Sequence, residues 1–130
     1  MYLLDTNTLV YFFKDIGGVK DKLGNVPPRE IGISAITLYE LEVGIAKSTH
    51  PDKRKRQLGE LISVITLFSF DQKETEIAAQ IRVDLEKRGE IIGPYDILIA
   101  ATALANGATL VTSNIREFSR IPRLQIEDWL

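Results

Sequence analysis

Apolar positions along the chain form two kinds of pattern, short continuous runs and longer stretches with helical spacing. Short apolar runs bounded by glycine, proline or polar residues are typical of buried strands, and we expect strands at 2–4, 30–33, 65–70, 109–112 and 124–126. Longer stretches with apolar positions at helical spacing predict helices at 8–13, 36–45, 51–64, 72–88 and 96–106. Strands and helices therefore alternate through most of the chain, which predicts an α/β fold with a parallel sheet covered by helices.

Local signals mark where several of these helices begin and end. Ser34 is a suitable N-cap for the helix that follows it, and Asp71 with Glu74 forms a capping-box pattern. Gly89 and Gly107 are natural stops after their helices. The segment 15–29 is rich in glycine and proline, so we expect a loop with at most a helical turn around 20–23.

The size and composition favour a single soluble domain. The 130 residues, of which 45% are hydrophobic and 26% charged, are enough for one core and are typical of folded proteins. The chain has no cysteine, and its apolar runs are shorter than the roughly 20 residues that cross a bilayer. Because a strand-like segment stands directly at the N-terminus, we expect no signal peptide or membrane anchor, and a cytoplasmic protein.

Four acidic residues fall near the same predicted edge of the sheet. They are Asp5 after the first strand, Glu40 in the helix after the second, Asp96 at the start of an apolar helix, and Glu117 past the strand at 109–112. Ligands collect beyond the carboxyl ends of parallel strands. Carboxylates brought close together need a cation to offset their repulsion, and oxygen ligands suit Mg²⁺ or Mn²⁺. The positions therefore predict a metal site.

Each of these residues also has a simpler structural explanation. Asp5 is a favoured N-cap, the helix dipole alone favours Asp96 in a first turn, and Glu117 lies in a polar stretch typical of a surface. However, Glu40 lies on a helix that is apolar nearly all round, and a lone charge before the buried run 97–101 would be costly. His50 is the only histidine, which excludes catalysis by a histidine pair and favours metal-activated water.

Four short motifs resemble those of a known family over essentially the whole chain. They are Leu3-Leu4-Asp5-Thr6-Asn7-Thr8, the segment SAITLYELEVG from Ser34 to Gly44, Gly93-Pro94-Tyr95-Asp96 with Ile99-Ala100, and Thr112-Ser113-Asn114-Ile115-Arg116-Glu117-Phe118. In this order and spacing they are similar to the VapC-type PIN-domain ribonuclease toxins of type II toxin–antitoxin systems. The resemblance implies a three-layer α/β/α PIN-like domain spanning 1–130, with a central, mostly parallel sheet.

The resemblance also implies roles for individual residues. Asp5 and Asp96 match the family's main metal ligands and Glu40 its third acidic residue. Many PIN domains have an aspartate where this chain has Asn114, so Glu117 is expected to supply the fourth carboxylate, and a complete second metal site is in doubt. Our hypothesis is that Asp5, Glu40, Asp96 and Glu117 catalyse hydrolysis around Mg²⁺ (or Mn²⁺), with Asn7, Asn114 and Arg116 in supporting positions.

The expected partners follow from the same resemblance. The tail residues 114–118 and 124–129 are most similar to the subgroup of endonucleases specific for initiator tRNA. The family implies an RNA substrate, a VapB-like antitoxin and a homodimer. A net charge of −2 argues against RNA binding by overall charge, so local basic residues must contact it, including the run 53–56 and Arg116.

Two other functions remain as alternatives. The first is a catalytically weak PIN fold that only binds RNA or a regulator, which Asn114 and the modest net charge favour. The second is an aspartate-nucleophile phosphatase, because the segment 3–8 faintly resembles the opening of that class. Asn7 stands where the second aspartate would be and no later lysine motif follows, so the phosphatase is the weaker alternative.

Overall fold

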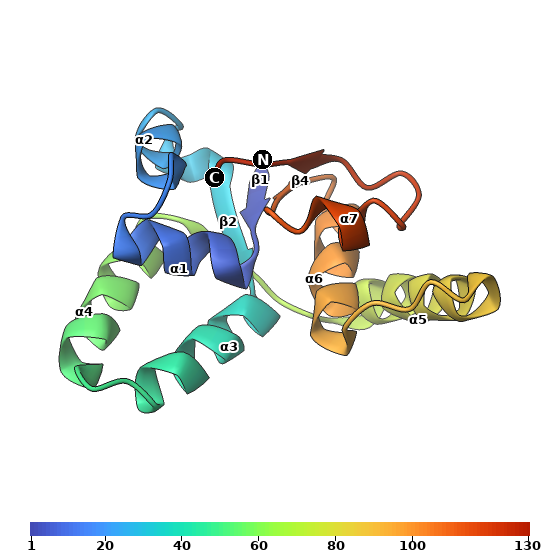
Figure 1. Ribbon diagram of the computed structural model, residues 1–130, viewed down its shortest axis with the longest axis horizontal. Helices are drawn as coiled ribbons and strands as arrows, with labels where there is room; N and C mark the ends of the chain where they lie inside the picture. Colours follow the sequence, from blue (N-terminus) through green and yellow to red (C-terminus); the bar gives the residue numbers. More distant parts are fainter.

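The computed structural model describes residues 1–130 and contains one five-stranded sheet with helices on both faces (Figure 1). All strand pairs are parallel, in the order β3-β2-β1-β4-β5. The strands are β1 (Tyr2–Leu4), β2 (Ile31–Ser34), β3 (Thr66–Phe68), β4 (Thr109–Val111) and β5 (Ile126–Glu127). The helices are α1 (Thr6–Lys14), α2 (Val19–Gly24), a 3₁₀ turn (Pro28–Glu30), α3 (Ala35–Ala46), α4 (Pro51–Ile62), α5 (Gln72–Arg88), α6 (Pro94–Ala105) and α7 (Ile115–Phe118).

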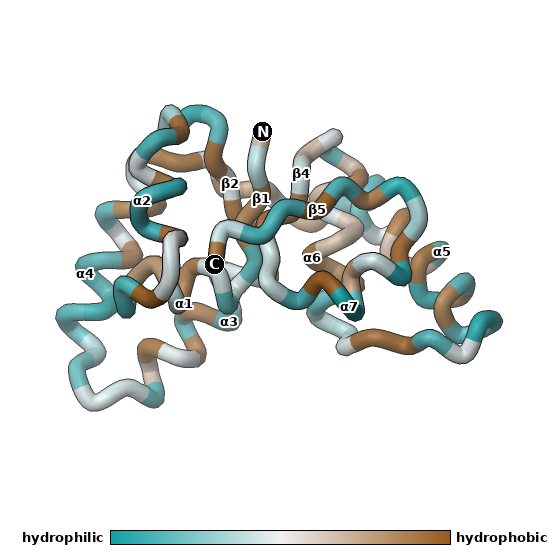
Figure 2. The backbone as a smooth tube through the Cα atoms, turned by 45° about the horizontal axis from the view of Figure 1, so that its top comes forward, coloured by the Kyte–Doolittle hydropathy of each residue, from teal (hydrophilic) through white to brown (hydrophobic).

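The sheet separates two hydrophobic cores, because successive residues of a strand point to opposite faces. In β1, Leu3 packs into the core beneath α5 and α6, whereas Leu4 packs into the core beneath α1 and α4. Leu110 and Val111 of β4 divide in the same way. Figure 2 shows the hydrophobic strands in the middle of the molecule and the mainly hydrophilic α4 at its edge. The expected α/β/α layers are therefore confirmed.

The predicted caps form as the sequence indicates. The Ser34 hydroxyl accepts a hydrogen bond from the Thr37 backbone N–H at 3.0 Å. Asp71 and Glu74 form a reciprocal capping box at the start of α5. Gly89 ends α5 with φ of 66°, in the left-handed region that glycine adopts without strain.

The boundaries of several elements differ from the sequence-based prediction. Helix α1 begins at Thr6 rather than residue 8, and α6 begins at Pro94, so that Asp96 is its third residue rather than its first. Proline suits a first helical position because no helical partner exists for its missing N–H. The segment 15–29 contains a full short helix, α2, and the four-residue helix α7 was not predicted. Both lack a long amphipathic repeat, so periodicity alone gives no signal for them.

The strand order reverses direction between β1 and β4. From β1 the chain moves outward to β2 and β3, and it then returns to place β4 on the other side of β1. In open parallel sheets, such a switch point opens a crevice at the carboxyl ends of the two strands. Asp5 follows β1 and the segment 112–117 follows β4, so both lie at this crevice. No helix is long and apolar enough to span a membrane.

Candidate active site

Asp5 stands at the carboxyl end of β1 with its side chain almost fully buried. It is the N-cap of α1, and its Oδ1 accepts a hydrogen bond from the Thr8 N–H at 2.9 Å. The Asp5 N–H in turn donates to the carbonyl of Val111 at 3.0 Å, which joins the ends of β1 and β4. Asp5 therefore has the structural role of a cap, and its second carboxylate oxygen has no hydrogen-bond donor within the chain.

Glu40 lies in the second turn of α3 and is half-buried. Its Oε1 accepts a hydrogen bond from the Thr6 hydroxyl at 2.6 Å, and that hydroxyl lies 3.3 Å from the Thr37 hydroxyl. The contact joins α1 to α3 across 34 positions of sequence. Because a hydrogen bond to a carboxylate is short and strong, Thr6 fixes the direction of the Glu40 side chain.

Asp96 is the most perturbed acid of the chain. Its pKa is raised from the ordinary 3.8 to about 6, first by burial and then by the negative charges of Asp5, Glu40 and Glu117. A helix N-terminus would by itself favour the charged form. Burial and repulsion outweigh that effect here, since all three neighbouring carboxylates lie within electrostatic range of Asp96. The structure thus brings together the four acidic residues that the sequence singles out.

No basic residue neutralises this carboxylate cluster, which we define as Asp5, Glu40, Asp96 and Glu117. Each of the five ion pairs in the chain uses other carboxylates. The donors are hard oxygens of the kind that divalent cations such as Mg²⁺ and Mn²⁺ bind, so the residues present fit such an ion. As the side chains stand, no three of these carboxylates converge on a single point.

The supporting residues have fewer contacts. Asn7 and Arg116 are exposed and Asn114 is half-buried. None of the three side chains forms a hydrogen bond or ion pair. The Asn114 backbone N–H donates to the hydroxyl of Thr112 at 3.0 Å, which shapes the turn between β4 and α7. Arg116 lies on the same short helix as Glu117, and their two proposed roles stay predictions from the sequence.

A groove of about 460 Å³ begins at Glu40 and runs between α1, α3 and α4. Thr6 and Glu40 lie at its acidic end, and its basic lining residues are Lys14, Lys47, His50 and Arg54. Within the basic run 53–56, only Arg54 lines this groove, whereas Lys55 pairs with Glu42 on α3. The basic run is therefore not one continuous patch.

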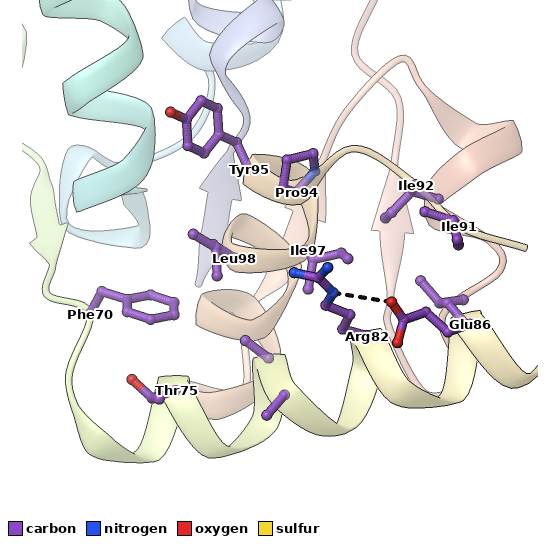
Figure 3. Close-up of a pocket in the computed structure, with 13 residues that line it drawn as sticks. Phe70, Thr75, Arg82, Glu86, Ile91, Ile92, Pro94, Tyr95, Ile97 and Leu98 are labelled. Carbon is purple, nitrogen blue, oxygen red and sulfur yellow. Dashed lines mark hydrogen bonds and ion pairs between the residues drawn. The ribbon is translucent and has the colours of Figure 1, made fainter.

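A larger cavity, of about 550 Å³, lies elsewhere between α5 and α6. Most of its lining is apolar, and its Arg82 and Glu86 side chains pair with each other (Figure 3). It contains none of the four clustered carboxylates. We take the carboxylate cluster as the site because it contains the reactive groups, although its groove is the smaller of the two hollows.

Sequence reasoning missed the hydroxyl residues around Glu40. Thr6 belongs to the first motif, and a hydroxyl next to a candidate metal ligand was a visible signal that it could support the site. Thr37, which is fully buried, gave no such signal, because its place beside Thr6 depends on how α1 packs on α3.

The comparisons with known proteins agree with this architecture. The PIN domain family model matches residues 2–124. Ribonuclease VapC2 of Rickettsia felis is 40% identical and covers 99% of this chain and 98% of its own length. The tRNA(fMet)-specific endonuclease VapC of Salmonella typhimurium is 37% identical, over 98% of this chain and 97% of its own.

A solved structure gives the same result. The crystal structure of VapBC2 from Rickettsia felis bound to a promoter DNA fragment superposes with a TM-score of 0.92 at 39% identity, covering 99% of this chain and 98% of the matched one. The chain therefore belongs to the PIN-domain family and, within it, to the VapC ribonucleases.

Proposed function

We propose that this protein is a divalent-metal-dependent endoribonuclease, the toxin of a VapBC-like toxin–antitoxin pair, that cleaves tRNA by hydrolysis. The observation that carries the proposal is the carboxylate cluster at the switch point of the sheet, where the charges of Asp5, Glu40 and Glu117 all act on Asp96 and none of the four acids has a basic partner. PIN-domain ribonucleases are generally dependent on a divalent metal, and the donor set of this chain suits Mg²⁺ or Mn²⁺.

In this proposal Asp5, Asp96 and Glu40 hold the ion and Glu117 adds the fourth carboxylate. A divalent cation, when bound, stabilises negative charge on phosphoryl oxygens and lowers the pKa of water. Thr6 keeps Glu40 directed into the site through its 2.6 Å hydrogen bond. Asn7, Asn114 and Arg116 have supporting roles, and the exposed guanidinium of Arg116 is suited to an incoming phosphate.

The proposed substrate is tRNA, with initiator tRNA as the first candidate. The support is the relative from Salmonella typhimurium, which is named as specific for tRNA(fMet) and aligns over 98% of this chain. The basic residues Lys14, Lys47 and Arg54 line the groove that leaves the acidic site, where an RNA backbone needs positive charge.

The proposed protein partners are a VapB-like antitoxin and a second copy of the chain. Similar solved structures are VapBC complexes, including one from Salmonella typhimurium bound to DNA, with a TM-score of 0.92. Light scattering of the purified protein, with and without the antitoxin, would measure both associations directly.

Incubation of purified protein with total tRNA tests the activity. We expect discrete fragments with Mg²⁺ or Mn²⁺ and none after chelation. Asp5→Asn is the informative variant because asparagine keeps the N-cap of α1 while it removes the charge, and it should reduce cleavage by at least about a hundredfold, as loss of a group that stabilises the transition state does.

The matched control is Glu42→Gln. Glu42 lies on the same helix as Glu40 but pairs with Lys55 outside the cluster, so its substitution should leave cleavage within about twofold. Full RNA binding by the folded wild type without any cleavage, with either metal, would favour the alternative of a PIN fold that only binds RNA or a regulator.

A further inference from the structure

Two exposed tyrosines flank the carboxylate cluster. Tyr39 precedes Glu40 on α3, and Tyr95 precedes Asp96 on α6. Their rings contact each other edge to face, with centroids 5.8 Å apart and planes at 71°. The pair therefore bridges the two helices that present Glu40 and Asp96, at the rim of the site.

Neither ring is needed to close the hydrophobic core. Tyr39 is 53% exposed and Tyr95 is 45% exposed, although both are large aromatic side chains. Two positions further along each helix, Leu41 and Ile97 are the residues buried in the two cores. Figure 3 shows the Tyr95 ring extending from the first turn of α6 towards α3, away from Ile92 and Ile97.

The geometry of the pair leaves aromatic surface free. In an edge-to-face contact one ring offers only its edge, so the contact itself covers neither face of that ring and only one face of the other, and about half of each side chain is exposed. The Tyr95 side chain also lies close to the acidic site, since its pKa is raised by the neighbouring Tyr39 and, further, by burial and the charge of Glu40.

A phosphodiester that reaches the cluster brings the bases on either side of it to this rim. Single-stranded bases are bound chiefly by stacking on aromatic side chains, which tolerates any sequence because every base has a flat face. We propose that Tyr39 and Tyr95 form a stacking platform for a nucleobase next to the scissile phosphate. This proposal rests on the proposed ribonuclease function, and it makes the two tyrosines positioning residues rather than catalytic ones.

The kinetic test compares Tyr39→Leu and Tyr95→Leu with Tyr39→Phe and Tyr95→Phe. Leucine removes the flat ring, whereas phenylalanine keeps it and removes only the hydroxyl. With an RNA hairpin around the mapped cleavage site, we expect the leucine variants to raise KM about tenfold with little change in kcat, as loss of one stacked base does. The phenylalanine variants should stay within about twofold.

Removal of the base from the substrate identifies the contact. A hairpin with an abasic nucleotide on the correct side of the cleavage site should bind wild type as weakly as the leucine variants bind the intact hairpin. The leucine substitutions should not weaken binding of the abasic hairpin any further, because the contact that they remove is already missing. A KM that is unchanged by leucine on the intact hairpin would overturn the proposal. A loss of antitoxin binding with unchanged RNA kinetics would overturn it as well, in favour of a protein-docking surface.

A binding assay separates this proposal from the ribonuclease function. The probe is a short oligoadenylate that carries the fluorescent base 2-aminopurine, measured in the presence of a chelator. Its fluorescence should be quenched on binding to wild type, and not on binding to the double variant Tyr39→Leu/Tyr95→Leu. Quenching without any cleavage, with either metal, would contradict the ribonuclease function but support base stacking on the two tyrosines. Cleavage without tyrosine-dependent quenching would support the ribonuclease function and contradict the stacking platform.

Discussion

The surroundings of Asp96 are unfavourable for a charged carboxylate, because the side chain is partly buried and the charges of Asp5, Glu40 and Glu117 act on it. Its raised pKa has a direct consequence for stability. The folded protein holds the Asp96 proton more tightly than the unfolded chain does, so folding is favoured through this group while the proton stays bound. That contribution is lost as pH rises from about 4 through the folded value of about 6.

Asp96→Asn therefore should stabilise the metal-free protein at neutral pH. Asparagine does not titrate, so the stability difference between the variant and wild type should depend on pH. We expect the free energy of unfolding of the variant, relative to that of wild type, to rise by about 2 kcal/mol between pH ~4 and pH ~7.5, since one pKa unit corresponds to about 1.4 kcal/mol. Urea denaturation at several pH values measures this difference. Asp84→Asn is the control, since Asp84 is exposed and paired with Arg88. A stability difference between Asp96→Asn and wild type that does not vary with pH would contradict the raised pKa of Asp96.

Thr6 provides a second prediction at the residue scale. Thr6→Val removes the hydroxyl that donates to Glu40 and should lower kcat about tenfold with little change in KM, because a hydrogen bond to a charged group is worth roughly 1.5–3 kcal/mol. Thr6→Ser keeps the donor and should keep most of the activity. Thr75→Val is the control, because its hydroxyl bonds the Asp71 carbonyl far from the site. Equal losses in the valine and serine variants would refute an orienting role.

At the scale of elements, strands and capped helices could be predicted from the sequence because their signals are local. Ser34 and the pair Asp71 and Glu74 cap their helices as expected. Helix α7 and the contact between Thr6 and Glu40 could not be predicted, because the first is too short for a periodic pattern and the second joins residues 34 positions apart. The Tyr39–Tyr95 pair could not be predicted either, because it joins residues far apart in sequence and depends on how α3 lies against α6.

The packing of β2 against β3 makes a prediction at this scale. A Cβ atom on Gly32 would lie 2.5 Å from the ring of Phe68, so Gly32→Ala must displace that ring. We expect it to lower the free energy of unfolding by about 1–3 kcal/mol, as overpacking does. Gly59→Ala is the matched control, because it lies in α4 with open space around it and should stabilise by about 0.5–1 kcal/mol. Thermal unfolding that ranks Gly32→Ala at or above wild type would contradict this packing.

At the scale of the whole molecule, the site is a consequence of topology. The sheet order places β1 beside β4, so that Asp5 and the segment before Glu117 meet although they are more than 100 positions apart in sequence. Helices α3 and α6, which contact each other, then bring Glu40 and Asp96 to the same place. The four acids could be picked out from the sequence by their positions: Asp5 and Glu117 follow strands, Asp96 precedes a buried apolar run, and Glu40 lies on a helix that is apolar nearly all round. The expected role of Asn114 stays a prediction, since its side chain makes no hydrogen bond.

The most direct measurement is the chemistry of the RNA ends after cleavage. Hydrolysis by water at the carboxylate cluster predicts fragments with 5′-phosphate and 3′-hydroxyl ends, which ligation-dependent sequencing of tRNA treated with wild type and with Asp5→Asn detects. We expect one or a few discrete sites with these ends, present only with a divalent metal and lost in the variant. Fragments ending in 2′,3′-cyclic phosphate, or cleavage that persists without metal or in the variant, would contradict the carboxylate cluster as the active site.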